Sequence, residues 1–209
     1  MNLQERAKED FLNTLLRLSY IKDKTRRKQL IKKAKSLAEK IPEFKGWPKA
    51  KKFWDIESSA WNVKIPNHVR RFIRKELLNR IKPGGLNLAL GSGSYPYIKD
   101  SVLVDYSEKM LEQVIVKCKK KVIHNIQKIP WPFKDNQFDS ITAVFILNYL
   151  KNLMHVFKEA RRVLKPMGKL IIVQSAKQLG EFYRLAEAKS YKPEEIIKLS
   201  LIFREGSSG

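Results

Sequence analysis

Short apolar runs that alternate with segments of helical periodicity constrain the fold of this chain more than any other feature. The apolar runs lie at residues 86–90, 102–104, 122–123, 138–145 and 169–173. Continuous apolar runs are typical of strands that are buried on both faces, as in a parallel sheet with helices on each side. The sequence therefore predicts an α/β fold built on a doubly wound, mostly parallel sheet.

Amphipathic helices are predicted ahead of this core. Residues 3–20 and 23–40 each place their apolar side chains on one face, and the second segment carries many lysines and arginines on the other. Residues 43–64 are aromatic and lysine-rich, and we expect a loop there, followed by a helix at 67–81. We therefore divide the chain into a basic helical extension (1–45), an aromatic and basic loop with a lead-in helix (46–83), and an α/β core (84–209).

The charge of the chain points to polyanionic partners. Its 43 basic and 21 acidic residues give a formal net charge of +22. A field of this strength attracts nucleic acid through release of counterions. We expect RNA as the partner, with Arg26, Arg27, Lys32 and Lys33 as contact residues; a lysine-rich solvated surface is the alternative.

Other functional classes are disfavoured by composition. No apolar run approaches the roughly 20 residues of a membrane span, and the polar start lacks the apolar stretch of a signal peptide. One cysteine, Cys118, excludes a cysteine-cluster metal site, and the three histidines are scattered. We expect a cytoplasmic protein without a membrane segment or a metal site.

Three segments that follow successive predicted strands indicate a nucleotide site. Gly91-Ser92-Gly93-Ser94 follows the first strand, where glycines permit close approach of a ligand to the backbone. Asp105 ends the second strand, where a carboxylate can accept both hydroxyls of a ribose. The third segment begins at Asn125. A plain turn at the glycines is the alternative interpretation, and Ser107 is a candidate helix N-cap.

Longer motifs in this region resemble a known family. They are Val104-Asp105-Tyr106-Ser107-Glu108-Lys109-Met110-Leu111, then Ile129-Pro130-Trp131-Pro132-Phe133 with Phe138-Asp139, and finally Glu159-Ala160-Arg161-Arg162-Val163-Leu164-Lys165-Pro166-Met167-Gly168-Lys169-Leu170. Residues 86–173 thereby resemble class I S-adenosylmethionine-dependent methyltransferases, in particular the broad group that includes the ubiquinone and menaquinone biosynthesis enzymes. The resemblance implies a Rossmann-like fold and S-adenosylmethionine as the cofactor.

The resemblance also implies roles for individual residues. Gly91 and Gly93 would pass the methionine part of the cofactor, Asp105 would hold the ribose, and Asn125 would face the adenine amino group, with Ile126 and Tyr106 beside the ring. The full expected cofactor set is Gly91, Ser92, Gly93, Ser94, Tyr95, Asp105, Tyr106, Ser107, Asn125, Ile126 and Phe145.

The sequence departs from the family pattern in its first motif. Ala89 stands where the family has an acid, and Tyr95 stands where it has a third glycine. Residues 95–100 are too few for the usual first crossover helix, so we expect a tight crossover between the first two strands.

Methyl transfer mainly requires alignment of the acceptor, so no catalytic triad is expected. Asn148 and Tyr149 follow the fourth strand and are the expected catalytic residues, since an amide oxygen can orient an amine and a tyrosine can stack on a base. Tyr97 is a second stacking candidate. The alternative for Asn148 is a helix N-cap.

The predicted function is methylation of ribosomal or transfer RNA, with an exocyclic base amine as the acceptor. Two alternatives stay open: a protein or small-molecule methyltransferase, and a non-catalytic RNA-binding factor with a degenerate methyltransferase fold, motivated by Ala89 and Tyr95. We expect a reduced last strand at residues 199–204.

Overall fold

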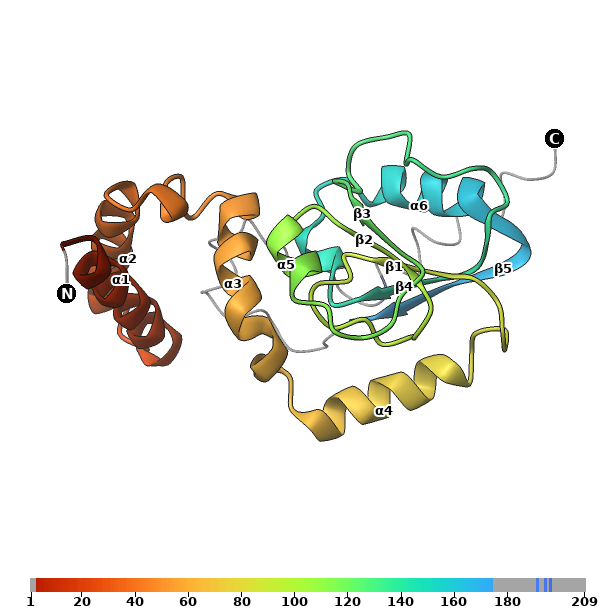
Figure 1. The fold of residues 1–209 in the computed structure, drawn as a ribbon, viewed down its shortest axis with the longest axis horizontal. Helices are drawn as coiled ribbons and strands as arrows, with labels where there is room; N and C mark the ends of the chain where they lie inside the picture. The colour runs from red at the N-terminus through yellow and green to blue at the C-terminus, as the bar shows by residue number, and fades with distance from the viewer. Residues whose placement is uncertain (1–2, 175–190, 192–193, 195, 197–209) are drawn as a thin grey trace.

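A computed structural model describes residues 3–174, 191, 194 and 196 of the chain (Figure 1). The predicted last strand at 199–204 lies outside the described residues. Within them, the sheet has five strands in the order β3-β2-β1-β4-β5, and every neighbouring pair is parallel. The strands are β1 (Asn87–Leu90), β2 (Val102–Asp105), β3 (Lys120–Ile123), β4 (Phe138–Val144) and β5 (Leu164–Val173). The predicted α/β fold is confirmed.

Alternate residues of the central strands face two different layers of helix. Leu88 and Leu90 belong to the cluster that includes Val156 and Phe157 of α6 (Leu153–Val163). The opposite face is covered by α5 (Glu108–Glu112) and by α4 (Asn67–Leu78), which packs through Ile73 and Leu77. Figure 1 shows α4 and α6 on opposite sides of the sheet.

The connection from β1 to β2 contains no helix, as predicted from its length. Ile98 of this connection packs against Ile73 and Leu77, so α4 covers the part of the sheet next to it. The predicted turn at 166–168 lies inside β5, where Met167 has a φ of 63° and the ladder with β4 is shifted. Helix α6 therefore runs directly into β5.

The N-terminal helices are α1 (Leu3–Tyr20) and α2 (Lys24–Glu39), as expected. They pack as a hairpin through the fully buried Phe11, Leu18, Ala34 and Ala38. The Asp23 side chain begins α2 by accepting a hydrogen bond from the backbone N–H of Arg26 at 2.7 Å.

The prediction of a loop over residues 43–64 is wrong from residue 50 onward. After a short 3-10 turn (η1, Pro42–Phe44), residues Ala50–Lys64 form helix α3. Phe53, Trp54 and Trp61 share one side of this helix because they recur at near-helical spacing, and Phe53 and Trp54 are buried. The mixture of lysines and tryptophans leads to the prediction of a loop, but the spacing of the aromatic residues is that of one face of a helix.

Helix α3 joins the extension to the core. One hydrophobic cluster contains Phe11 of α1, Ala38 of α2, Phe53 of α3 and Met110 of α5. Figure 1 shows α3 between the hairpin and α5. Apolar packing is thus continuous from the hairpin into the sheet domain.

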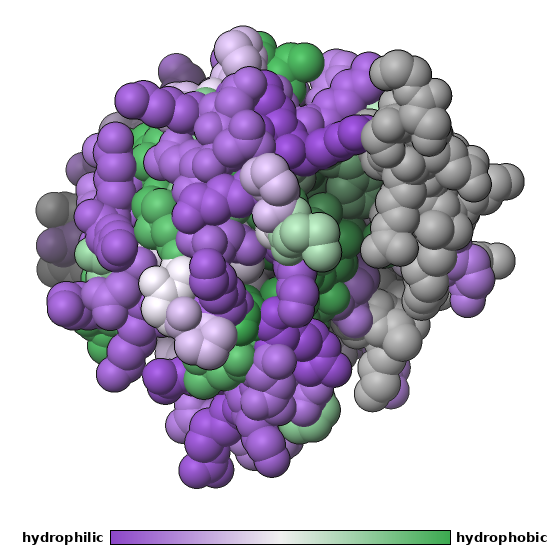
Figure 2. Space-filling view, turned by 90° about the vertical axis from the view of Figure 1, so that its right-hand side faces the viewer, coloured by the Kyte–Doolittle hydropathy of each residue, from purple (hydrophilic) through white to green (hydrophobic). Residues whose placement is uncertain are grey.

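The surface agrees with the charged composition. Figure 2 shows the face near α6 and β5, where the described residues are mainly hydrophilic. Among the described helices, none combines the length and apolar character that crossing a bilayer requires.

Candidate cofactor and acceptor site

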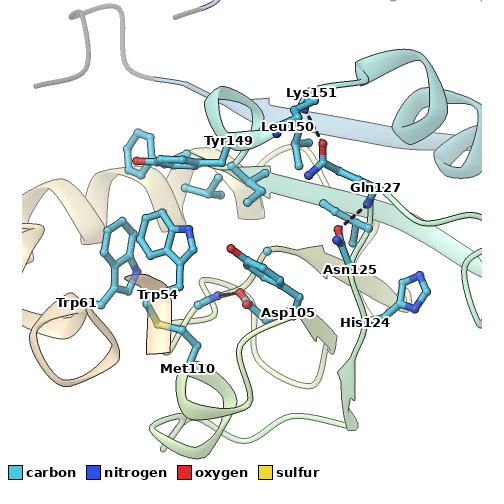
Figure 3. A pocket seen from close by; sticks show the side chains of 17 residues that line it. Trp54, Trp61, Asp105, Met110, His124, Asn125, Gln127, Tyr149, Leu150 and Lys151 are labelled. Atoms are coloured by element: carbon cyan, nitrogen blue, oxygen red, sulfur yellow. Dashed lines mark hydrogen bonds between the residues drawn. The ribbon is translucent and has the colours of Figure 1, made fainter. Parts of the chain in front are cut away.

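A cavity of about 260 Å³ opens at the carboxyl ends of β1, β2 and β4, beside α3 (Figure 3). This is the edge at which parallel α/β sheets bind their ligands. Several residues singled out from the sequence line it together: Gly91, Gly93, Asp105, Tyr106, Asn125, Ile126, Phe145 and Tyr149.

Asp105 is held in place by two loops. Its Oδ2 accepts a hydrogen bond from the backbone N–H of Gly93, and its Oδ1 accepts one from the backbone N–H of Ser107, both at 2.9 Å. The residue is only 8% exposed. Burial raises the pKa of the Asp105 carboxyl, while the backbone donors oppose that rise. A carboxylate has about four acceptor positions, so the two bonds leave capacity for hydroxyl donors of a ligand.

Gly91 and Gly93 have φ values of 52° and 56°, in the left-handed region that favours glycine. A Cβ on Gly91 would lie 2.5 Å from Ile146 Cδ1, and one on Gly93 would lie 2.9 Å from Trp61 Nε1. Glycine is therefore required at both positions for two reasons. It adopts the left-handed conformation without strain, and it leaves room for the side chains of Ile146 and Trp61.

The loop after β3 provides a polar end to the cavity. Asn125 Oδ1 accepts a hydrogen bond from the backbone N–H of Gln127 at 3.0 Å, and Gln127 in turn accepts one from the backbone N–H of Lys151. Trp131 Nε1 donates to the carbonyl of Ile126 at 2.8 Å. These bonds fix the loop that carries Asn125 and Ile126.

The other end of the cavity is aromatic. The rings of Trp54 and Tyr149 meet edge to face with their centroids 4.8 Å apart, and those of Trp54 and Trp61 meet in the same way at 5.4 Å. Figure 3 shows these three rings on one side of Asp105, with Asn125 and Gln127 on the other. The cavity is thus divided into an aromatic half and a polar half.

Several predicted residues lie outside this cavity. Ser92, Tyr95 and Tyr97 line a neighbouring cavity of only about 30 Å³, because the helix-free crossover turns toward α4. Arg70 lies 4.1 Å above the centre of the Tyr95 ring, and burial raises the pKa of Tyr97 to about 12. The expected place of Tyr97 at the rim is wrong.

Two of the predicted serines make contacts with α3. Ser94 Oγ donates a hydrogen bond of 2.8 Å to Asn62 Oδ1, and Ser107 Oγ donates one of 2.7 Å to Asp55 Oδ1. Ser107 Oγ also accepts from the backbone N–H of Met110 and begins α5, which agrees with its interpretation as an N-cap. Both serines thus attach α3 to the loops around the cavity.

Asn148 does not reach the cavity. It is 3% exposed, and its Oδ1 accepts a long hydrogen bond of 3.4 Å from the backbone N–H of Tyr191. Residues Leu147–Tyr149 form a 3-10 turn, η2, which directs Tyr149 into the cavity and Asn148 away from it. The expectation that Asn148 aligns the acceptor is therefore wrong, and the N-cap of α6 is Asn152.

The predicted RNA-contact residues lie on the hairpin, away from the sheet (Figure 1). Arg26, Lys32 and Lys33 are exposed on α2. Arg27 differs from them, because its Nη1 donates to the carbonyls of Leu18 and Ile21, each at 3.1 Å. Arg27 thus satisfies carbonyls at the end of α1, which argues against it as a phosphate contact.

The sheet order, the glycine turn and the acid at the end of β2 agree with a class I S-adenosylmethionine-dependent methyltransferase domain. Residues 83–172 match the family described as methyltransferase domain. The family predicted from the sequence is thereby confirmed.

Curated relatives match part of this chain. The chain is 40% identical to a demethylmenaquinone methyltransferase of Staphylococcus saprophyticus over 78 residues, which are 35% of this chain and 33% of the relative. It is 30% identical to a ubiquinone/menaquinone biosynthesis C-methyltransferase of Rickettsia typhi over 116 residues, 54% of this chain and 45% of the relative. The chain thus spans a third to less than half of these relatives.

A solved structure shares the fold. Phosphoethanolamine N-methyltransferase 2 of Haemonchus contortus, in a complex with S-adenosyl-L-methionine, superposes with a TM-score of 0.60 at 16% identity, over 76% of this chain and 44% of that one. At this identity the likeness concerns the fold alone.

About half of the residues that line the cavity are not among those predicted from the sequence. The missed residues are Trp54, Trp61, Met110, His124, Gln127, Val144, Ile146, Leu150 and Lys151. Trp54 and Trp61 lie outside the family match, and only their spacing of seven residues, two turns of a helix, signals a shared face. No cluster of potential metal ligands occurs within the described ranges.

Proposed function

We propose that this chain binds S-adenosylmethionine in the 260 Å³ cavity and is a methyltransferase. The observation that carries the proposal is the fixed carboxylate of Asp105 at the end of β2, joined to the glycine loop by the bond from Gly93. Asp105 is more than nine-tenths buried and its carboxylate is fixed in orientation, so it can accept hydrogen bonds from the two hydroxyls of a ribose at this edge of the sheet.

The residues present fit the cofactor part by part. Asp105 would accept the ribose hydroxyls, Asn125 would accept from the adenine amino group, and Tyr106 and Ile126 would flank the adenine ring. The backbone at Gly91 and Gly93 would face the methionine part. When bound, S-adenosylmethionine supplies an electrophilic methyl group. The chain then has to orient an acceptor and exclude water, and the aromatic half of the cavity suits both tasks.

Calorimetric titration with S-adenosylmethionine and S-adenosylhomocysteine tests this proposal. We expect saturable binding, and Asp105→Ala should weaken it by about 1–3 kcal/mol, since the ribose hydroxyls lose their acceptor. Glu112→Ala, at an exposed surface ion pair with Lys109, is the matched control and should bind like the wild type. Equal affinity of Asp105→Ala and wild type would remove Asp105 from the site.

For the acceptor, we propose RNA, with ribosomal or transfer RNA as the class. The net charge of +22 and the exposed Arg26, Lys32 and Lys33 on α2 support this choice. Replacing these three cations with glutamine should weaken RNA binding. It should also reduce the log–log salt slope by about 0.7–0.9 for each phosphate that the helix no longer neutralises. An unchanged slope would contradict a role of α2 in RNA binding.

A small aromatic acceptor is the second candidate, favoured by the apolar lining at Trp54, Tyr149 and Leu150. The relatives described above are named as quinone-biosynthesis methyltransferases, which agrees with it. Methyl transfer assayed in parallel with bulk RNA and with a naphthoquinol separates the candidates. Incorporation into RNA alone supports the first, and incorporation into the quinol alone supports the second.

A further inference from the structure

We propose that Trp54, Trp61 and Tyr149 form a subsite for an uncharged, planar aromatic ring, which is the part of the acceptor that enters the cavity. This inference rests on the proposed function and deepens it. The same ring chemistry is offered by a nucleobase and by a quinol, so it applies to both candidate acceptors.

The geometry of the three rings supports a subsite and not only a core. Trp54 stands between the other two, edge to face with each of them, at centroid distances of 5.4 Å to Trp61 and 4.8 Å to Tyr149. All three nevertheless line the cavity. Aromatic side chains arranged in this way provide a rigid apolar wall that favours flat rings through offset or edge-to-face contact.

The distribution of polar groups distinguishes the two ends of the cavity. Asn125, Gln127 and Lys151 lie together at one end, and the three rings lie at the other (Figure 3). The polar end suits the hydrogen-bonding groups of an adenosine. The aromatic end then remains for the methionine part, which would follow the backbone at Gly91 and Gly93, and for the ring of the acceptor.

The charges around the cavity favour a neutral ring over a cation as the ligand of the aromatic end. Aromatic walls also bind ammonium groups, most strongly where the site is desolvated. Asp105 is the sole carboxylate among the described residues that line this cavity, and the proposed function assigns its remaining acceptor positions to the ribose hydroxyls. A cation at the aromatic end would therefore lack an acid of its own.

Helix α3 holds two of the rings in position. Asn62 accepts a hydrogen bond from Ser94 and Asp55 accepts one from Ser107, so α3 is attached to the loops after β1 and β2. Arg70 of α4 donates to the backbone carbonyls of Trp61 and Asn62 at the end of the helix. A subsite held by such bonds is preorganised and loses little freedom when a ring binds.

Calorimetry with small probes tests the subsite. Protein saturated with S-adenosylhomocysteine is titrated with 2-naphthol as a quinol-like ring, with adenosine as a base, with trans-2-decalol as a saturated shape control, and with choline as a cation. We expect at least one flat probe to bind about tenfold or more tightly than decalol and choline, given the usual strength of base–aromatic stacking. The tighter flat probe identifies the source of the ring.

Variants assign the effect to the three residues. Trp61→Leu and Tyr149→Leu should each weaken the flat probe about tenfold, and Trp54→Phe, which keeps a ring, should weaken it less than Trp54→Leu. Trp47→Phe changes a buried tryptophan that packs on Phe11, away from the cavity, and should bind like the wild type. Thermal unfolding checks that each variant is folded. If Trp54→Leu does not fold, the Trp61 and Tyr149 variants still test the subsite, because these two side chains are only partly buried.

The outcomes separate this inference from the proposed function. Normal binding of S-adenosylhomocysteine with no preference for flat probes, or with choline preferred, overturns the subsite alone. If S-adenosylhomocysteine fails to bind the wild type, the proposed function fails, and the titrations are repeated without it. If the protein then still prefers flat probes to decalol and choline, and this preference still depends on Trp61 and Tyr149, the subsite is supported independently of the proposed function.

Discussion

The hydroxyl of Ser107 donates a hydrogen bond of 2.7 Å to Asp55, and this bond joins the loop after β2 to helix α3. Ser107 is fully buried, and its backbone N–H donates to Asp105. One residue therefore contacts both the acid of the proposed cofactor site and the helix that carries Trp54 and Trp61.

Removal of this bond should destabilise the chain. Asp55→Ala leaves the buried Ser107 hydroxyl without its acceptor, and we expect a loss of about 1–2 kcal/mol in the free energy of unfolding, measured by urea denaturation. Lys51→Ala removes only the exposed ion pair that Lys51 makes with Asp55, and should cost less than about 0.5 kcal/mol. Equal effects of the two substitutions would show that the Ser107–Asp55 bond contributes nothing.

Alanine at Gly93 should be more costly than alanine at an open glycine. Gly93 has a φ of 56°, which costs roughly 1–2 kcal/mol for other residues, and a Cβ there would contact Trp61. Gly46→Ala is the matched control, because Gly46 has a φ of 88° but nothing within 4 Å of a Cβ. We expect Gly93→Ala to unfold at a clearly lower urea midpoint than Gly46→Ala and to bind S-adenosylmethionine more weakly. Coincident midpoints would contradict the close packing of Trp61.

The Glu159–Arg162 pair predicts a dependence of stability on acid. The hydrogen bond from Arg162 is the main reason why the pKa of Glu159 lies below its usual value, and burial opposes it. A lowered pKa in the folded state gives stability that is present above the pKa of the unfolded chain. That stability is lost as pH falls through the folded value.

Arg162→Leu tests this linkage. The substitution leaves Glu159 without its charged partner, and we expect a loss of about 2 kcal/mol or more at pH 7. The difference from wild type should shrink as pH falls through the lowered pKa of Glu159 in the wild type, because the protonated side chain no longer forms the ion pair. Urea titrations at pH 7 and at a series of lower pH values provide the comparison, and a difference that stays constant throughout the series would contradict the pairing.

Cofactor affinity should fall with acidification earlier than for an ordinary aspartate. Burial raises the pKa of Asp105, and the ionised form has more acceptor capacity for ribose hydroxyls than the protonated form. Affinity for S-adenosylhomocysteine should therefore decline as pH falls through the raised pKa, above the usual value of about 3.9. Asp105→Asn should bind more weakly at pH 7 and lack this decline, and a parallel decline in both proteins would assign it to another group.

The strands and the carboxyl-edge residues are predictable because their signals are local. Each strand contains a short apolar run; Gly91 directly follows β1, Asp105 is the last residue of β2, and Asn125 lies two residues after the end of β3. Parallel strands place their ends at one edge, so these residues converge in the cavity without further information.

The aromatic half is not predictable in this way. Trp54 and Trp61 reach the cavity only through the packing of α3 on α5, which depends on contacts distant in sequence. Asn148 and Tyr149 are neighbours, yet the 3-10 turn directs only Tyr149 inward, and a local pattern does not specify that rotation. The prediction for Tyr97 fails because the path of the helix-free crossover is set by α4.

The cluster that contains Phe53, Trp54 and Met110 limits how the sheet domain can be truncated. The recognisable family segment begins at residue 83, but a fragment cut there would leave Met110 of α5 uncovered and remove one wall of the cavity. Such a fragment should be prone to aggregation, because newly bared apolar patches promote self-association. The smallest fragment that keeps this cavity therefore begins upstream of α3, and fusion or truncation experiments should retain the helices that precede residue 83.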